Sequence, residues 1–271
     1  NYEKFFVSQQ KSFFGKMATK DNNWAYDYLP KFDVAYDVLK MVDMMAAGQM
    51  NGLFCQGLNI MMAAPNKTKV ASGLAKLKWM VVIDPLETET ARFWENHGEY
   101  NNVDPKAIQT EVIQLPASAY AEEEGSATNS SRVIMWHWKA VEGPGESKSD
   151  MEIVSALRGR LAALYAKEGG AFPDPIVNTT WDYKNPADPD PQEVLKEING
   201  YALEDLPDPA NPGKVLLQAG KLLPSFALMR DDGKTAGGMW IYTGVFTEAG
   251  NMSMRRDAAD PTGLGIHPNW G

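Results

Sequence analysis

The sequence predicts an α/β fold with an open, mostly parallel sheet and flanking helices. Between residues 33 and 116 a helical pattern and an extended pattern alternate three times, which is the order of an open α/β sheet. The middle strand, in WMVVIDP, is apolar at successive positions, as in parallel strands that are buried on both faces. From residue 171 onward repeated Pro-Asp steps indicate irregular structure. We therefore expect an α/β domain followed by an irregular Pro- and Gly-rich insertion with a β-hairpin.

These changes in pattern divide the chain into three segments. Residues 1–32 are expected to be an irregular N-terminal arm, and residues 33–170 form the α/β domain. Residues 171–271 are expected to be a loop-rich insertion with one short helix and a hairpin.

The first half of the α/β domain begins with an amphipathic helix. Asp33 can cap this helix and Gly48 can end it, with apolar residues at three- and four-residue spacing between them: Val34, Val38, Val42 and Met45. Residues 53–55 form a short apolar strand. A second helix over residues 65–77 opens with a proline, as helices often do, and has one apolar face made by Val70, Leu74 and Leu77.

The remaining elements follow in order. The strand in WMVVIDP is followed by a helix over LETETARFWEN and by a third strand, TEVIQLP, which Pro116 stops. Ser149 and Glu152 have the spacing of a capping box before a long helix that Gly169 ends. Farther on we expect a short helix over residues 192–198 and a hairpin in GGMWIYTGVFTEAG.

Composition excludes several classes of protein and site. A net charge of -9 disfavours binding to nucleic acid or to an anionic membrane surface, since both repel acidic proteins. A single cysteine, Cys55, excludes an internal disulfide and a zinc or iron-sulfur site built from cysteines of this chain. No stretch approaches 18 uninterrupted apolar residues, so we expect no membrane span. The first residues, Asn1-Tyr2-Glu3, lack an initiator methionine and suggest a segment of a longer polypeptide.

Two strand ends carry polar residues that suit a ligand. Asp84 ends the middle strand, and its carboxylate could accept two hydrogen bonds from a guanine edge or from ribose, while the helix expected after it offers backbone N–H groups to phosphate. Capping of that helix by Asp84 and Thr88 is an equally simple interpretation. In the turn 56–59, Gly57 could bring the backbone close to a ligand and Asn59 has an amide that donates and accepts. Such turns also contain Gly or Asn for conformational reasons alone.

A third polar loop, AEEEGSATNSSR, follows the third strand. Gly125, Asn129 and Ser130 suit a phosphate or a ribose, and Arg132 could hold an anion. A solvated acidic loop is the simpler interpretation of three consecutive glutamates. Because ligands of open α/β sheets lie beyond the carboxyl ends of the strands, we expect the three loops to share one rim.

Side-chain chemistry by this chain alone is not indicated. The three histidines have no metal-ligand spacing, and Trp136-His137-Trp138 reads better as a packed aromatic patch. No nucleophile elbow, Ser-His-Asp order or phosphate-binding G-x-x-x-x-G-K loop is present in the sequence. We therefore expect neither a catalytic residue nor a metal ligand in these 271 residues.

Taken together, the polar loops and their flanks resemble one family. The stretches KMATKDNNWAYDYLPK, GLFCQGLNIMMAAPNK, VVIDPLETETARFWENHGEYNNVDP, TEVIQLPASAYAEEEGSATNSSR and RDDGKTAGGMWIYTG are similar to the catalytic alpha subunit of respiratory formate dehydrogenases, in the molybdopterin oxidoreductase superfamily. The resemblance covers nearly the whole chain. It implies that this chain is a central segment of such a subunit and that residues 33–170 bind a dinucleotide cofactor.

The resemblance also implies a cofactor and an assignment of residues. In this family two molybdopterin guanine dinucleotides hold molybdenum or tungsten, formate is oxidised to carbon dioxide, and an iron-sulfur cluster carries electrons away. By position, the pterin dinucleotide loop corresponds to Gln56, Gly57 and Asn59; the nucleotide-recognition element corresponds to Asp84, Thr88 and Thr90; and the later loop corresponds to Gly125, Asn129 and Arg132.

Some features of the family lie outside this chain. Its cluster cysteines and the selenocysteine or cysteine that binds the metal, followed by histidine, are not in the sequence, and Cys55 is followed by Gln56. Cys55 is therefore not the expected metal ligand. The family usually has proline where this chain has Ile60, which adds an N–H group to the turn and leaves its conformation open.

The resemblance further implies partners and a location. Formate is the expected substrate in anaerobic respiration, with an iron-sulfur beta subunit, a membrane cytochrome gamma subunit and the rest of the same polypeptide as partners, in the periplasm. Two alternatives remain: a non-catalytic module that binds cofactor or docks a subunit, and a molybdopterin oxidoreductase acting on another small substrate. The isolated segment is expected to be inactive.

Overall fold

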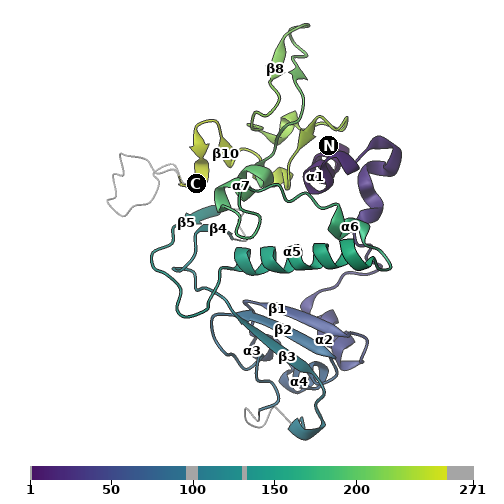
Figure 1. Ribbon diagram of the computed structural model, residues 1–271, viewed down its shortest axis with the longest axis vertical. Helices are drawn as coiled ribbons and strands as arrows, with labels where there is room; N and C mark the ends of the chain where they lie inside the picture. Colours follow the sequence, from purple (N-terminus) through teal and green to yellow (C-terminus); the bar gives the residue numbers. More distant parts are fainter. Residues whose placement is uncertain (1, 96–102, 130–132, 255–271) are drawn as a thin grey trace. The chain divides into compact units, whose positions relative to one another are not determined.

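The computed structural model describes residues 2–95, 103–129 and 133–254, which belong to two compact units (Figure 1). The sheet unit comprises Lys31–Glu123 and Lys139–Ile153, and the insertion unit comprises Asn1–Pro30, Glu124–Trp138 and Val154–Gly271. The segment limits expected at residues 32 and 170 remain a sequence-based prediction.

The sheet unit contains the expected parallel sheet. Its three strands are β1 (Gly52–Gln56), β2 (Trp79–Asp84) and β3 (Glu111–Pro116), in the order β1-β2-β3 and all parallel (Figure 1). Cys55 lies opposite Val82 in the register, and Gln56 lies opposite Ile83. The last five residues of β2 are buried, in agreement with its uninterrupted apolar run. The predicted α/β class with an open parallel sheet is confirmed.

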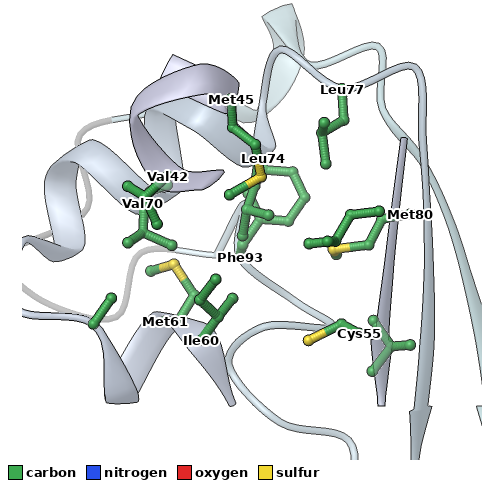
Figure 2. Close-up of a cluster of buried hydrophobic side chains, with 14 of the residues drawn as sticks. Val42, Met45, Cys55, Ile60, Met61, Val70, Leu74, Leu77, Met80 and Phe93 are labelled. Carbon is green, nitrogen blue, oxygen red and sulfur yellow. The ribbon is translucent and has the colours of Figure 1, made fainter. Parts of the chain in front are cut away.

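Three helices cover one face of this sheet around a single core. They are α2 (Val38–Ala46), α3 (Ile60–Ala63) and α4 (Lys67–Leu74). Cys55 and Met80 contribute from the strands, and Figure 2 shows them with helix residues in the same cluster. The helical members of the core labelled there are Val42, Met45, Ile60, Met61, Val70 and Leu74.

The first helix begins later than the sequence predicts. Its N-cap is Asp37, whose carboxylate accepts a hydrogen bond from the Lys40 backbone N–H at 2.7 Å. Asp33 instead accepts a hydrogen bond from the Tyr36 hydroxyl at 2.6 Å, which lowers the pKa of the Asp33 carboxyl. The helix α4 likewise begins after Asn66, which caps it, rather than at the preceding proline.

The helix expected over LETETARFWEN is not formed. Residues 89–94 instead follow consecutive turns, with backbone hydrogen bonds from Arg92 N–H to the Thr88 carbonyl and from Glu95 N–H to the Arg92 carbonyl. Thr90, Ala91 and Phe93 are buried in these turns. The prediction of a helix was wrong for the described residues, because tertiary contacts can override local helix propensity.

The insertion unit consists of small elements. Its helices are α1 (Tyr2–Phe14), most of α5 (Asp150–Glu168), α6 (Asp174–Val177) and α7 (Pro191–Asn199). Its strands form antiparallel pairs: β4 (Gly125–Thr128) with β5 (Ile134–His137), β6 (Tyr201–Ala202) with β9 (Thr235–Ala236), β7 (Leu206–Pro207) with β8 (Val215–Leu217), and β10 (Phe246–Thr247) with β11 (Gly250–Asn251). Within the described ranges, no helix combines the length and apolarity needed to cross a membrane.

Several expected elements of this region are present. The long helix α5 starts where predicted, and the Ser149 hydroxyl accepts the Glu152 backbone N–H at 3.1 Å. The short helix near residue 192 is α7, and the expected hairpin is confined to β10 and β11. Residues 1–32, which the sequence led us to expect as irregular, include the 13-residue helix α1.

One buried amide joins several of these elements. Asn199, at the end of α7, has a fully buried side chain. Its Nδ2 donates to the carbonyls of Gly200 and Leu223 at 2.9 and 3.1 Å. Its Oδ1 accepts from the backbone N–H groups of Gly244 and Phe246 at 2.6 and 3.1 Å. The Asn199 amide thus connects the backbone at residues 200, 223 and 244–246.

A left-handed turn follows α1. Asn23, Trp24 and Ala25 all have positive φ, at 51°, 60° and 59°. The side chain of Gln10 donates to the Trp24 carbonyl at 2.8 Å, and the Trp24 N–H donates to the Thr19 carbonyl at 2.7 Å. This conformation is unfavourable for non-glycine residues, so tertiary contacts are needed to hold it.

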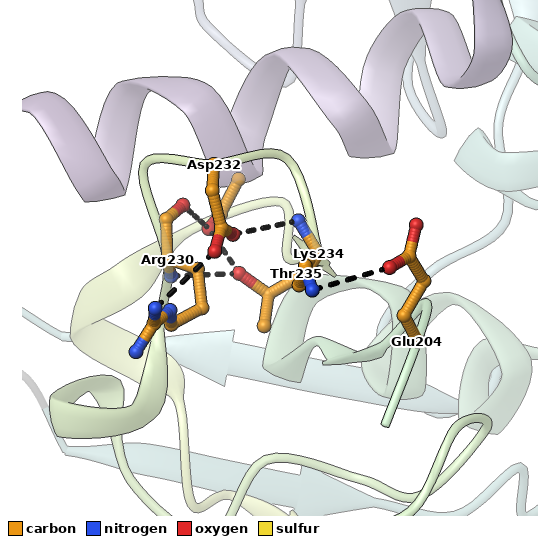
Figure 3. A network of polar contacts seen from close by, with 6 residues as sticks. Glu204, Arg230, Asp232, Lys234 and Thr235 are labelled. Carbon is orange, nitrogen blue, oxygen red and sulfur yellow. Dashed lines mark hydrogen bonds and ion pairs between the residues drawn. The ribbon is translucent and has the colours of Figure 1, made fainter. Parts of the chain in front are cut away.

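The loop before β9 is fixed to α1 by polar contacts (Figure 3). The Thr235 hydroxyl lies 2.8 Å from the Ser8 hydroxyl and accepts the Arg230 backbone N–H at 2.9 Å. Arg230 pairs with Asp232 at 3.2 Å, and Lys234 pairs with Glu204 at 3.4 Å. The ion pairs are partly exposed, so the buried hydroxyl pair is the more important contact.

Candidate functional site

The turn after β1 is open to solvent at its tip. Gln56 ends the strand with an exposed side chain, and Gly57 follows with φ at 59°. The Gly57 N–H donates to the Ile83 carbonyl of the neighbouring strand at 2.9 Å. A Cβ atom at Gly57 would meet nothing within 4 Å, so there is space above this turn for a ligand to approach the backbone.

Asp84 stands at the corresponding end of β2 and is 9% exposed. Its Oδ1 accepts the Leu86 backbone N–H at 2.9 Å, which makes an Asx turn. Because no helix follows, Asp84 does not cap one. Within the described residues, its Oδ2 takes part in no hydrogen bond and can accept from a ligand.

Thr88 and Thr90 differ sharply in their surroundings. The Oγ1 of Thr88 is buried and has no hydrogen-bond partner among the described residues. Thr90, by contrast, is fully buried, and its hydroxyl is bonded on both sides. An unpaired buried hydroxyl costs free energy, so Thr88 is the better candidate to meet a polar group that the described residues do not supply.

Asn59 connects the two strand ends. Its Oδ1 accepts the Thr90 hydroxyl at 2.8 Å, and its Nδ2 donates to Oε2 of Glu89 at 2.6 Å. The expectation that the turns after β1 and β2 lie together is therefore confirmed. Glu89 was not singled out from the sequence, and a contact with a residue 30 positions away has no local sequence signal.

Ile60 and Cys55 belong to the hydrophobic core of the sheet unit. The Ile60 side chain is 1% exposed within the core, and its N–H donates to the Leu58 carbonyl at 3.1 Å (Figure 2). The Cys55 thiol donates to the same carbonyl at 2.9 Å. Burial, with a smaller effect of the nearby Asp84 charge, raises the pKa of this thiol, so Cys55 remains protonated and unreactive near neutral pH.

The third polar loop belongs to the insertion unit. Gly125 starts β4, and the Asn129 side chain accepts the Val133 backbone N–H at 3.2 Å in the turn toward β5. Arg132 lies outside the described residues. The expectation that this loop shares a rim with the first two remains a prediction. Of the aromatic patch expected at residues 136–138, Trp136 is buried against Leu195 and Phe246, whereas Trp138 is 46% exposed.

In residues 2–95, 103–129 and 133–254, no three His, Cys, Asp or Glu side chains come together as a metal site would require. The polar strand ends in these ranges suit hydrogen bonds to an organic ligand.

Comparison with known proteins gives the family. The family model described as "Molybdopterin oxidoreductase" matches residues 102–160 of the chain. Over 100% of its length the chain is 54% identical to the nitrate-inducible formate dehydrogenase major subunit and 52% identical to the formate dehydrogenase-O major subunit, both of Escherichia coli. It is 49% identical to the formate dehydrogenase major subunit of Haemophilus influenzae over 99% of its length.

The chain belongs to the molybdopterin oxidoreductase family. It spans about a quarter of the length of these curated relatives, 26% in each case. Family membership supports a molybdopterin cofactor. The open backbone at Gly57, the acceptor on Asp84 and the orphaned hydroxyl of Thr88 are groups that a polar, nucleotide-bearing ligand can pair with.

Proposed function

We propose that this chain is a segment of a formate dehydrogenase catalytic subunit and binds molybdopterin guanine dinucleotide. Its relatives of 49–54% identity are named formate dehydrogenases and match it from end to end. The observation that carries the proposal within the structure is the buried, unpaired Thr88 hydroxyl close in sequence to Asp84, at the carboxyl end of a parallel strand.

The nine residues named from the sequence are the proposed cofactor-binding residues, six in the sheet unit and three in the insertion unit. Gln56 and Gly57 present the first turn, while Asp84 and Thr88 offer an acceptor and a hydroxyl for the nucleotide. The remaining members are Asn59, Thr90, Gly125, Asn129 and Arg132. When bound, a bis-molybdopterin centre with molybdenum or tungsten supplies the two-electron oxidation of formate to carbon dioxide.

The proposal extends to the assembly. The metal ligand, the catalytic residues and the iron-sulfur cluster are assigned to parts of the polypeptide outside this segment, and the segment alone is inactive. One relative of 37% identity is named for cytochrome c-553, which favours a respiratory electron-transfer chain. An iron-sulfur beta subunit, a membrane cytochrome gamma subunit and a periplasmic location belong to the same proposal.

A different substrate is the second candidate. The chain is 31% identical to an assimilatory nitrate reductase catalytic subunit of Bacillus subtilis over 50% of its length. This match is shorter and less similar than those to formate dehydrogenases, so formate is the favoured substrate. A formate-dependent dye-reduction assay and a nitrate-reduction assay of the complete enzyme separate the two.

The cofactor site is tested by Thr88→Val in the complete subunit. Removing an orphaned buried hydroxyl is neutral or stabilising for the protein alone, so loss of cofactor would report a bond to the ligand. We expect cofactor affinity to fall about three- to tenfold, the equivalent of one hydrogen bond. The measurement is guanine and metal per purified subunit after a mild denaturant challenge.

A matched control uses the same chemical change elsewhere. Thr243 of the insertion unit also has a buried Oγ1 without a partner in the described chain, and Thr243→Val should leave cofactor content unchanged. Asp84→Ala should lower guanine and metal content more strongly than Thr88→Val. Full cofactor content in both the Asp84 and the Thr88 variants would refute the proposed site.

A further inference from the structure

A chain of hydrogen bonds joins the turns after β1 and β2. The Met61 backbone N–H donates to the Thr90 hydroxyl at 3.1 Å, and this hydroxyl donates to Asn59 Oδ1 at 2.8 Å. The amide nitrogen of Asn59 then donates to the Glu89 carboxylate at 2.6 Å. Four residues from two separate turns thus complete a single network.

The direction of every bond in this network is determined. A backbone N–H can only donate, so the hydroxyl of Thr90 accepts from Met61 and has its proton left for Asn59. The amide oxygen of Asn59 must then face Thr90, which turns the amide nitrogen toward Glu89. An ionised carboxylate accepts such a bond strongly, so Glu89 fixes the orientation of the amide.

The network satisfies a group that the local chain leaves without a partner. Met61 is the second residue of the short helix α3, whose first N–H groups have no partner within the helix. Thr90, which is fully buried, provides the acceptor from 29 residues away. Because its side chain is enclosed, Thr90 acts on a ligand only through the residues it holds.

We propose that Glu89 is a positioning residue for the cofactor site, which holds the turn Gln56–Asn59 against the end of β2 through Asn59 and Thr90. The inference rests on the proposed function and assigns Asn59 and Thr90 to this bridge. Gly57 gives the turn conformational freedom, and ordering such a residue costs backbone entropy. A bridge formed before binding removes that cost from the binding step.

The test uses two pairs of variants in the complete subunit. Glu89→Ala and Thr90→Val remove the bridge, whereas Glu89→Gln and Thr90→Ser keep an acceptor and a hydroxyl in place. Hydrogen exchange of the cofactor-free subunit is measured for the peptide covering residues 57–62. Cofactor retention is measured as guanine and metal per subunit after the same denaturant challenge.

We expect both disruptive variants to accelerate exchange in residues 57–62 and to weaken cofactor retention, each by about tenfold, the effect of one lost bond of about 1.4 kcal/mol. The conservative partners should stay within about twofold of the unmodified protein. A peptide from α7 in the insertion unit should exchange at an unchanged rate in all four variants. The two disruptive variants remove different bonds of the Asn59 amide, so the result does not depend on whether either one folds poorly.

Three outcomes oppose the inference. Unchanged exchange in Glu89→Ala would overturn it, as would faster exchange with full cofactor retention. Loss of cofactor from Glu89→Gln and Thr90→Ser would also overturn it, since the bridge needs only an acceptor at residue 89 and a hydroxyl at residue 90. The proposed function fails separately, when Asp84→Ala and Thr88→Val retain all of their cofactor.

Discussion

Replacing Asn199 by alanine should destabilise the insertion unit more than any surface substitution. The side chain is fully buried, and both donors and both acceptors of its amide are used by backbone groups of Gly200, Leu223, Gly244 and Phe246. Asn199→Ala leaves the Leu223 carbonyl and the N–H groups of Gly244 and Phe246 without this partner at once, whereas the Gly200 carbonyl still accepts the Leu223 N–H. The elements that they belong to lose their common anchor.

The magnitude follows from these three backbone groups. Each unsatisfied buried group costs about 1–3 kcal/mol, but water entering the space left by the side chain can replace some of the bonds. We therefore expect a loss of about 3–5 kcal/mol in the free energy of local unfolding, at the upper end for single substitutions. Asn199→Asp should also destabilise, because its second oxygen would face the carbonyls of Gly200 and Leu223.

Native-state hydrogen exchange of the complete subunit measures this loss, since a multidomain protein does not unfold in two states. The amides of Ala202 and Leu223 are suitable probes, because they donate to the backbone carbonyls of Lys221 and Gly200 and not to Asn199. Asn178→Ala is the control: its side chain makes one bond of 3.4 Å, to the Tyr28 hydroxyl, and its loss should cost below about 1 kcal/mol. An effect of Asn199→Ala no larger than the control would refute the reasoning.

Three further outcomes are expected. Ile60→Ala should reduce the stability of the sheet unit by about 2–5 kcal/mol and Ile60→Val by about 0.5–1.5 kcal/mol, measured by exchange of core amides; equal costs would contradict its burial. Iodoacetamide should label Cys55 at pH 8 at least about 100-fold more slowly in the native than in the denatured protein, because its pKa is raised and its thiol enclosed; fast native labelling, located by peptide mapping, would disprove this. Gly233→Ala should cost more than Gly213→Ala in local unfolding free energy, by about 1–3 kcal/mol: both glycines have positive φ, but only at Gly233 would a Cβ come within 2.7 Å of the Trp24 ring.

The sheet could be predicted from the sequence because its signals are local. An uninterrupted apolar run identifies β2, and Pro116 marks the end of β3. The carboxyl ends of neighbouring parallel strands share one edge, so Gln56 and Asp84 could be assigned to adjacent turns. These inferences need only the pattern within each strand and the rule for open sheets.

Other features depend on partners far away in the chain. Helix α1 buries three polar residues, Ser8, Gln10 and Ser12, beside Val7 and Phe14, so its inward face is mixed and its apolar periodicity is weak. Ser8 pairs with Thr235, and Ser12 donates to Glu197 at 2.8 Å. A single sequence carries no local sign of such pairs, and the segment was expected to be irregular.

In the candidate site, too, local features could be predicted from the sequence and long-range contacts could not. Asn59 and Thr90 could be named from the sequence, but their mutual hydrogen bond could not, because 31 residues separate them. The sequence pattern favoured a helix over LETETARFWEN, whereas residues 89–94 form turns in which Thr90, Ala91 and Phe93 are buried. Glu89 was not singled out from the sequence, and only the geometry showed its contact with Asn59.

The left-handed turn at Asn23, Trp24 and Ala25 constrains the order of folding. Positive φ at a non-glycine residue costs about 1–2 kcal/mol, so the three together oppose the turn by several kcal/mol. The bond from Gln10 and the packing of the Trp24 ring against Gly233 offset this cost, and both partners lie outside the turn. The turn therefore forms after α1 and the loop at residue 233 have come together, and a peptide of residues 15–30 should not adopt it.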